Sequence, residues 1–208
     1  AARLNKRGVH TMHLKTLLAG LSLRSATADM ETEITRISYD SRTTAPGDVF
    51  VAMTGFATDG HAYIGKAVAA GAAAVVCERP PEDSSVPYVL VENSRRALAV
   101  MAANYYGHPA DSMTMVAVTG TNGKTTTTYL LKAILEQARG AKVGLIGTNQ
   151  NMIGSDVIPT ERTTPESFEV QKLFREMADA GCTHVVMETS SHALYLDRVY
   201  GVHYDVGI

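Results

Sequence analysis

The segment with the clearest chemical signature is VAVTGTNGKTTTT, which runs from Val116 to Thr128. Its apolar start predicts a buried strand, and its polar end predicts a helix that begins near Lys124. Glycines between the two allow a tight turn, so that backbone N–H groups and the positive end of the helix dipole can face one anion. A lysine and a hydroxyl at the helix start suit nucleotide phosphates and their Mg²⁺. The predicted phosphate loop consists of Gly120, Thr121, Asn122, Gly123, Lys124, Thr125 and Thr126.

This loop departs from the general pattern G-x-x-x-x-G-K-[ST], because Val118 occupies the place of the first glycine. The alternative is a glycine turn before a helix, with Lys124 merely exposed. The strand before the turn, the helix after it and the K-T-T sequence favour nucleotide binding. Neither D-x-x-G nor N-K-x-D follows, so guanine has no recognition motif and we expect ATP.

A second candidate is Glu188, which ends the apolar run HVVME. The carboxyl end of a strand would place this acid on the same edge of the sheet as the phosphate loop, where a second Mg²⁺ ligand beside Thr125 belongs. The alternative is an acid that caps the following turn. Hydroxyls at 189–191 and His192 follow at once, whereas plain turns more often use Gly, Asn or Pro. We therefore predict that Lys124 and Glu188 are catalytic and that Thr125 and Glu188 hold the metal.

The polar stretch PTERTTP, from Pro159 to Pro165, precedes a predicted helix and follows the strand KVGLIGT. Arg162 could bind a phosphate or a carboxylate, and Thr163 and Thr164 could donate hydrogen bonds to one. The alternative for Thr164 is simple capping of the helix that follows. From these residue types alone both interpretations stay open.

The elements that must position these residues form two groups. Short β-rich runs between Ile34 and Val91 alternate with small-residue helical segments, which predicts a compact α/β unit closed by a helix from Ser94 to Tyr106, with Ser94 as its cap. The cluster GHPADSM then marks a link, so we expect one domain at 1–111 and another at 112–208. In the second domain apolar strands alternate with helices, which predicts a mostly parallel sheet. The final run HYDVGI predicts a strand whose sheet would continue, so we expect the chain to be the first part of a longer protein.

Composition narrows the class of protein. The 208 residues carry a net charge of −2 and are 45% hydrophobic, so we expect a globular protein that binds neither nucleic acid nor a membrane surface. The stretch LLAGLSL followed by SATA mimics a secretory signal, but Ser22 and Arg24 interrupt it and a nucleoside triphosphate is a cytoplasmic resource. We expect a short amphipathic helix there, a cytoplasmic protein, and a start at Met12 with residues 1–11 as an extension.

Cys77 and Cys182 end apolar runs, which favours buried thiols over a disulfide.

Together these motifs resemble the Mur ligases. The resemblance spans almost the whole chain, through YDSRTTAPGDVFVAMTG and DGHAYIGKAVAAGAAAVV, then TGTNGKTTT, RTTPE and METSSHALYLDRV. The phosphate loop is common to all Mur ligases and to folylpolyglutamate synthetases. The DSR, PGD and DGH motifs with SSHAL are narrower and indicate the branch that forms the tripeptide.

The resemblance implies a three-domain enzyme with an N-terminal domain that binds uridine diphosphate, a central domain that binds ATP and a C-terminal domain, absent here, that receives the amino acid. It places the uridine diphosphate at Ser41, with Tyr39 nearby and Phe56, Ala57 and Thr58 on the uracil side. It assigns the muramoyl peptide to Thr163, Thr164, Ser190 and Arg198. Leu196 departs from the pattern, because some members have a polar residue there. A carbamoylated lysine that bridges Mg²⁺ in the family would follow Ile208.

The implied reaction begins when the D-glutamyl carboxylate of UDP-N-acetylmuramoyl-L-Ala-D-Glu attacks the γ phosphate of ATP. An amino acid, lysine or meso-diaminopimelate, then captures the acyl phosphate. The rivals are the ligase that adds D-Ala-D-Ala, a folylpolyglutamate or cyanophycin synthetase, against which the DSR-bearing domain argues, and a fragment that binds UDP-sugar or nucleotide without catalysis. We expect the protein to be a monomer. For the 208-residue chain by itself we expect binding without ligation.

Overall fold

The computed structural model describes residues 3–4, 10–55, 58–160 and 162–208. The chain divides into two units, Ala1–Tyr105 and Tyr106–Ile208. The sequence placed the boundary slightly later, at the breaker cluster that ends near residue 111. Mixed α/β units with parallel strands confirm the predicted fold class.

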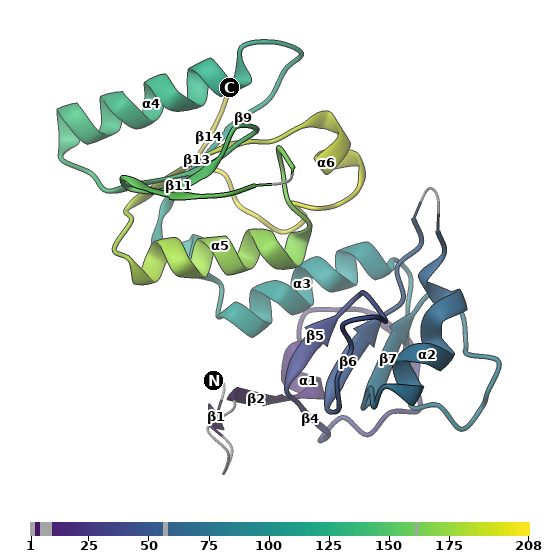
Figure 1. Ribbon diagram of the computed structural model, residues 1–208. Coiled ribbons are helices and arrows are strands. Elements are labelled where there is room, and N and C mark those ends of the chain that lie inside the picture. The colour runs from purple at the N-terminus through teal and green to yellow at the C-terminus, as the bar shows by residue number, and fades with distance from the viewer. Residues whose placement is uncertain (1–2, 5–9, 56–57, 161) are drawn as a thin grey trace. The chain divides into compact units, whose positions relative to one another are not determined.

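The first unit contains a five-stranded sheet in the order β3-β8-β7-β6-β5 (Figure 1). Strands β5 to β8 are parallel, and β3 joins β8 antiparallel at the edge. Both β6 and β7 are buried along their whole length, as expected for strands covered on two faces. The strands are β3 (Leu23–Ala26), β5 (Arg36–Ser38), β6 (Asp48–Val51), β7 (Ala74–Cys77) and β8 (Tyr88–Val91), and the helices are η1 (Gly60–Tyr63), α2 (Ile64–Ala69) and α3 (Ser94–Tyr106).

A smaller sheet, in the order β1-β2-β4, precedes this one. Its strands are β1 (Arg3–Leu4), β2 (His10–His13) and β4 (Glu33–Ile34). The helix predicted for the stretch LLAGLSL, at residues 17–23, is wrong over most of that stretch, because a turn follows Leu17 and strand β3 begins at Leu23. A single helical turn, α1 (Leu14–Leu17), ends at the first residue of the stretch, and its Leu14 and Leu17 are fully buried. The helix is therefore anchored in the core of the first unit.

The cap of α3 differs from the prediction. The side-chain oxygen of Asn93 accepts hydrogen bonds from the backbone N–H groups of Arg95 and Arg96, at 2.9 and 3.0 Å. Ser94 instead donates its own N–H and its hydroxyl to Glu78 Oε1, at 2.8 and 2.7 Å. The predicted Ser94 cap is wrong because the residue before it reaches the free N–H groups first.

The second unit contains a six-stranded sheet in the order β12-β11-β10-β13-β9-β14. Four strands, β10, β13, β9 and β14, are parallel, whereas β11 and β12 form an antiparallel hairpin at one edge that the sequence analysis did not predict. The strands are β9 (Thr114–Val118), β10 (Val143–Ile146), β11 (Asn151–Ile153), β12 (Asp156–Ile158), β13 (His184–Glu188) and β14 (Val206–Gly207). The helices are η2 (Pro109–Ser112), α4 (Lys124–Arg139), α5 (Ser167–Asp179) and α6 (Ser191–Tyr195).

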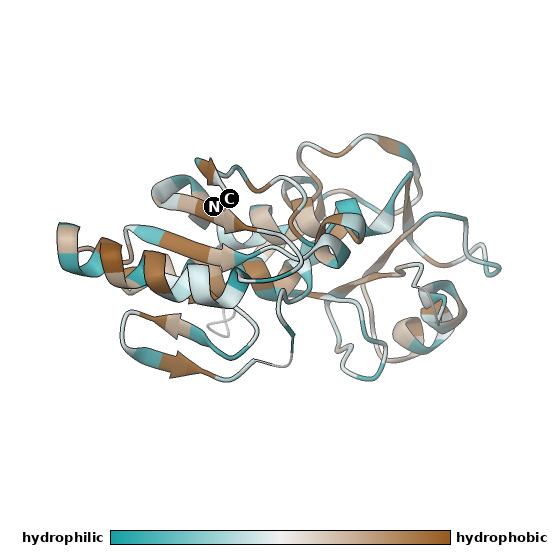
Figure 2. Cartoon of the chain, turned by 90° about the horizontal axis from the view of Figure 1, so that it is seen from above, coloured by the Kyte–Doolittle hydropathy of each residue, from teal (hydrophilic) through white to brown (hydrophobic). Residues whose placement is uncertain are grey.

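Helices α4 and α5 cover opposite faces of this sheet (Figure 1). Alternate residues of each strand point to opposite faces, so Val186 packs under α4 while Val185 and Met187 pack against α5. In Figure 2, α4 carries both hydrophobic and hydrophilic residues, as expected for a helix with one face on a sheet. The unit is a three-layer sandwich with the parallel strands in the middle.

Strand order decides which residues meet at the carboxyl edge. The chain passes from β9 through α4 to β10, but β13 lies between these two strands. Glu188 is paired in register with Val118, the last residue of β9. The end of β13 is therefore flanked by the loop after β9 on one side and the loop after β10 on the other.

The prediction for the two cysteines has an outcome in the structure. Cys77 and Cys182 are both buried free thiols, as predicted, and burial raises the pKa of Cys77 to about 11. Within the described residues, no helix is both long and apolar enough to cross a membrane.

Candidate functional site

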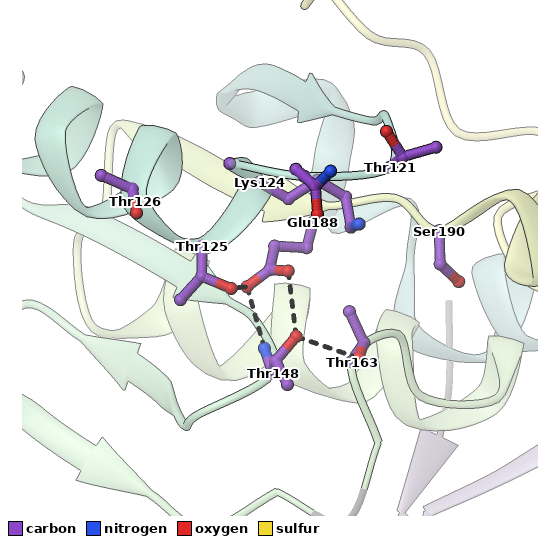
Figure 3. A pocket seen from close by; sticks show the side chains of 10 residues that line it. Thr121, Lys124, Thr125, Thr126, Thr148, Thr163, Glu188 and Ser190 are labelled. Carbon is purple, nitrogen blue, oxygen red and sulfur yellow. Dashed lines mark hydrogen bonds between the residues drawn. The ribbon is translucent and has the colours of Figure 1, made fainter.

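A cavity of about 300 Å³ lies at the carboxyl edge of the second sheet (Figure 3). It brings together most of the predicted phosphate loop, the predicted metal acid and two of the predicted substrate residues. Its lining residues are Thr121, Asn122, Gly123, Lys124, Thr125, Thr126, Thr148, Thr163, Glu188 and Ser190.

The phosphate loop has the backbone conformation that glycine allows. Gly120 and Gly123 have φ angles of +125° and +81°, which are rare for residues with a side chain. Gly123 is the N-cap of α4, and no side chain of a described residue caps the first N–H groups of that helix. These N–H groups and the helix dipole form an anion cradle. The Lys124 ammonium donates to the Gly120 carbonyl at 2.7 Å, so it folds back over the loop and would exchange this carbonyl for a phosphate oxygen.

Glu188 is the central side chain of the cavity and is fully buried. Its Oε1 accepts hydrogen bonds from the Thr125 hydroxyl at 2.9 Å and from the Thr148 backbone N–H at 3.0 Å. Its Oε2 accepts from the Thr148 hydroxyl at 3.0 Å. Figure 3 shows the carboxylate held between Thr125 and Thr148, which follow the two strands on either side of β13.

Gly147 makes this position of the carboxylate possible. A Cβ atom at residue 147 would lie 2.6 Å from Glu188 Oε1, far inside the contact distance. A side chain at residue 147 would displace the carboxylate from its hydrogen bonds with Thr125 and Thr148, so the glycine serves the position of the acid rather than a turn.

The hydroxyl groups around Glu188 have a defined direction. Thr148 donates its only hydroxyl hydrogen to Glu188, so in its 3.0 Å contact with Thr163 the hydrogen comes from Thr163. Thr125 also donates toward Glu188. The oxygen atoms of Thr125 and Thr163 therefore present lone pairs to the cavity, which suits cations and hydrogen-bond donors.

This donor set fits Mg²⁺. Within the described residues Glu188 forms no ion pair, and a buried carboxylate without a cation is costly. A carboxylate and a threonine hydroxyl beside a phosphate cradle match the ligands that Mg²⁺ takes when it also binds phosphate and water. No group of three His, Cys, Asp or Glu side chains that could hold a metal ion occurs in the described ranges, and among the residues that line this cavity Thr125 and Glu188 are the candidate ligands.

Other predicted residues lie outside the cavity lining. Thr164 is 1% exposed, donates to the Glu188 carbonyl at 2.8 Å and accepts from the Ser190 N–H at 3.3 Å. It does not cap α5, whose N-cap is Glu166. Arg198 donates to the Thr164 carbonyl at 3.2 Å and lies 3.4 Å from Glu166. Arg162 is exposed in the same loop.

The first unit has its own cavity, of about 620 Å³, at the end of β5 and β6. Three predicted substrate residues, Tyr39, Ser41 and Thr58, line it, while the predicted Phe56 and Ala57 lie outside the described residues. The sequence analysis missed the three cations that share its wall, Arg42, Lys66 and Arg95. The other lining residues are Asp40, Phe50, Met53, Gly55, Gly60 and Tyr63.

The DGH motif builds one wall of this cavity. A Cβ on Gly60 would lie 2.7 Å from the backbone N and O of Met53, so only glycine fits. Asp59 accepts from the His61 ring at 2.7 Å, and the other ring nitrogen accepts from the Glu78 N–H at 2.9 Å. The hydrogen bond from Arg79, followed by that from the His61 N–H, lowers the pKa of Asp59 well below its ordinary value. The motif is a rigid structural anchor of the loop.

Thr148 and Gly147 are the functional residues that sequence reasoning missed in the second unit. A signal was present, because both stand at the carboxyl end of the run KVGLIGT and so lie at the same edge of the sheet as Glu188. The missing information was the strand order, which places β10 directly beside β13.

A strand, a glycine turn and a helix that begins with Lys-Thr define the class of P-loop nucleotide-binding folds. Two family models match the chain: the Mur ligase family, catalytic domain, at residues 33–106, and the Mur ligase middle domain, at residues 118–208. The chain belongs to the Mur ligase family.

Among its relatives are UDP-N-acetylmuramoyl-L-alanyl-D-glutamate–2,6-diaminopimelate ligases. The proteins from Clostridium tetani and Clostridium botulinum are 48% and 50% identical over 201 residues, which cover 95% of this chain and 41% of each relative. A solved structure of a ligase with the same name is similar in fold, with a TM-score of 0.76 and 23% identity over 95% of this chain and 39% of that one. A crystal structure of MurF from Acinetobacter baumannii has a TM-score of 0.60 and 26% identity over 88% of this chain and 36% of that chain. The chain thus spans about two fifths of the length of the curated relatives that it matches.

Proposed function

We propose that the complete protein is an ATP-dependent ligase of peptidoglycan synthesis that adds meso-diaminopimelate to UDP-N-acetylmuramoyl-L-Ala-D-Glu. The observation that carries the proposal is the position of Glu188 beside the phosphate loop, with its Oε1 2.9 Å from the Thr125 hydroxyl. The choice of diaminopimelate over lysine is supported by the names of the relatives.

In this reaction the substrate carboxylate attacks the γ phosphate of ATP, and the amine of the amino acid then displaces phosphate from the acyl phosphate. Both reactants of the first step are anions, so the site must offset their repulsion. Lys124 and the N–H groups at the start of α4 bind and orient the phosphates. Thr125 and Glu188 hold Mg²⁺, which when bound neutralises further phosphate charge.

The cavity of the first unit supports a role in binding the uridine diphosphate. Ser41 and Thr58 offer hydroxyl groups, and Arg95 and Lys66 offer positive charge for a diphosphate. The Arg95 side chain is oriented by its Nε, which donates to the Thr54 carbonyl at 3.2 Å. Lys66 lies 5.4 Å from the centre of the Tyr63 ring.

The rest of the assignment follows from the same proposal. The muramoyl peptide would bind near Thr163 and Ser190, which line the cavity, with Thr164 and Arg198 supporting that loop from inside. The protein would work as a cytoplasmic monomer, with the boundary of its nucleotide domain near residue 111. The alternative for the 208-residue chain itself is a module that binds UDP-sugar and nucleotide without ligation.

The test is a calorimetric titration of the chain with Mg-ATP and with UDP-muramoyl dipeptide. Lys124→Ala should reduce Mg-ATP affinity at least about tenfold, because a charge-assisted contact to phosphate is lost. Circular dichroism should show an unchanged fold. Lys172→Ala removes an exposed lysine of α5 outside the cavity and should bind like the unmodified chain.

In the complete enzyme, Lys124→Ala should abolish ligation, which is measured as the release of phosphate that depends on both the dipeptide and the amino acid. Normal turnover by Lys124→Ala would refute the assignment of the phosphate loop. Phosphate release by the 208-residue chain, dependent on both substrates, would defeat the binding-only alternative.

A further inference from the structure

The loop after β10 makes a contact with Glu188 that neither the phosphate loop nor the family motifs include. Thr148 uses both its backbone N–H and its hydroxyl on the two carboxylate oxygens, at 3.0 Å each. Among the described residues, Thr148 donates hydrogen bonds to both oxygens of Glu188, whereas Thr125 donates to Oε1 alone. Because both oxygens are held, the Glu188 carboxylate cannot rotate about its Cγ–Cδ bond.

The second partner of Thr148 extends this contact to the peptide loop. Its hydroxyl lies 3.0 Å from the Thr163 hydroxyl, which lines the same cavity (Figure 3). The hydrogen of Thr163 is directed to Thr148 and the hydrogen of Thr148 to Glu188. A continuous chain of hydrogen bonds thus joins the loop at 159–165 to the acid beside the phosphate loop.

The orientation of the Thr125 oxygen depends on the same acid. Because Thr125 donates its hydrogen to Oε1, its lone pairs are turned away from Glu188 and toward the cavity. If the carboxylate rotated, the Thr125 hydroxyl would lose its acceptor and its direction. Groups that orient metal ligands in this way are worth about 10- to 100-fold in metal affinity.

We propose that Thr148 is a positioning residue, which holds Glu188 and through it Thr125 in the geometry that binds Mg²⁺, and which ties this geometry to Thr163. The proposal rests on the proposed function, since it needs Mg-nucleotide in this cavity. Thr148 acts through Glu188: its N–H and its hydroxyl donate to the carboxylate, and its oxygen accepts the hydrogen of Thr163.

The test is Thr148→Val, which keeps the shape and the backbone N–H but removes the hydroxyl. Thr148→Ser restores the hydroxyl, and Thr183→Val removes an exposed hydroxyl from the opposite end of the sheet, where its partner is His184. ATP affinity is measured by calorimetry in EDTA and in Mg²⁺, and Mn²⁺ binding in the presence of ATP is measured by electron paramagnetic resonance. The melting temperature of each metal-free variant is recorded as well.

We expect Thr148→Val to weaken Mn²⁺ binding about tenfold or more, with ATP affinity in EDTA unchanged, and Thr148→Ser to recover most of the loss. Thr183→Val should match the unmodified chain. Equal Mn²⁺ affinity in Thr148→Val and the unmodified chain would overturn the inference while leaving the proposed function intact. A lower melting temperature with unchanged metal affinity would show a merely structural role and would also overturn it. If the unmodified chain binds no Mg-ATP, the proposed function itself fails and the inference with it.

Discussion

At the scale of single residues, the cavity of the second unit depends on how closely Glu188 is surrounded. Three hydrogen bonds from Thr125 and Thr148 and the absence of a side chain at Gly147 leave the carboxylate one position. The acid is buried without an ion pair among the described residues, so its charge is available to a cation. The two proposed metal ligands are therefore held in place by hydrogen bonds within the protein.

The Gly147→Ala substitution should displace the Glu188 carboxylate from its hydrogen-bonded position. The added methyl would overlap Glu188 Oε1, so we expect the free energy of unfolding to fall by about 1–3 kcal/mol and Mn²⁺ affinity to drop. Gly65→Ala is the control, because a Cβ there meets no atom within 4 Å and alanine favours the helix. Urea denaturation and metal titration would measure both; an unaffected Mn²⁺ affinity in Gly147→Ala would contradict the close packing.

At the scale of elements, β13 is the strand on which the site depends, and the segment before β14 packs against its end. Tyr204 lies before β14 with its hydroxyl 3.1 Å from the Met187 sulfur, and Thr189 donates to that hydroxyl at 3.4 Å. Burial raises the pKa of Tyr204 to about 12. The phenol is thus kept neutral on the two residues that flank Glu188.

This pKa predicts a loss of stability in alkali. The unfolded phenol ionises near its ordinary pKa of about 10 and the folded one near 12, so the free energy of unfolding should fall by up to about 1.4 kcal/mol per pH unit between these values. For the Tyr204→Phe variant, the free energy of unfolding should fall less per pH unit between these two pKa values. Urea denaturation at a series of alkaline pH values checks this, with Tyr195→Phe, which removes an exposed phenol, as the control. Equal slopes for Tyr204→Phe and the unmodified chain would contradict the burial of the phenol.

At the scale of the whole molecule, the chain has two units, and each unit has a cavity among its described residues. The cavity of the first unit combines hydroxyls, aromatic rings and cations, and that of the second combines a phosphate cradle with an acid. Each is lined by residues of its own unit.

Arg95→Ala should therefore separate the two binding events. It removes a cation from the first cavity, so UDP affinity should fall about tenfold. Mg-ATP affinity should not change. Arg96→Ala, at a neighbouring exposed position outside the cavity lining, is the control for the loss of one charge. Calorimetry with UDP and with Mg-ATP provides the measurement, and unchanged UDP affinity would remove Arg95 from the site.

The sequence by itself determined the local elements and the candidates that follow them. The apolar strand, the glycines and Lys-Thr predicted the phosphate loop before α4, and the strand-end position of Glu188 predicted an acid at the same edge. These features depend on residues that are neighbours in the chain. Family resemblance added the cavity residues Tyr39, Ser41 and Thr58.

Only the tertiary structure decided which loops meet. Because β13 lies between β9 and β10, Glu188 is held by Thr125 on one side and by Thr148 on the other, a pairing that no spacing in the sequence expresses. The same holds for Thr164, whose hydroxyl is committed to the end of β13 rather than to a helix cap. The physical reason is that hydrogen-bond partners of a buried group are set by strand order and register, which arise from packing across the whole sheet.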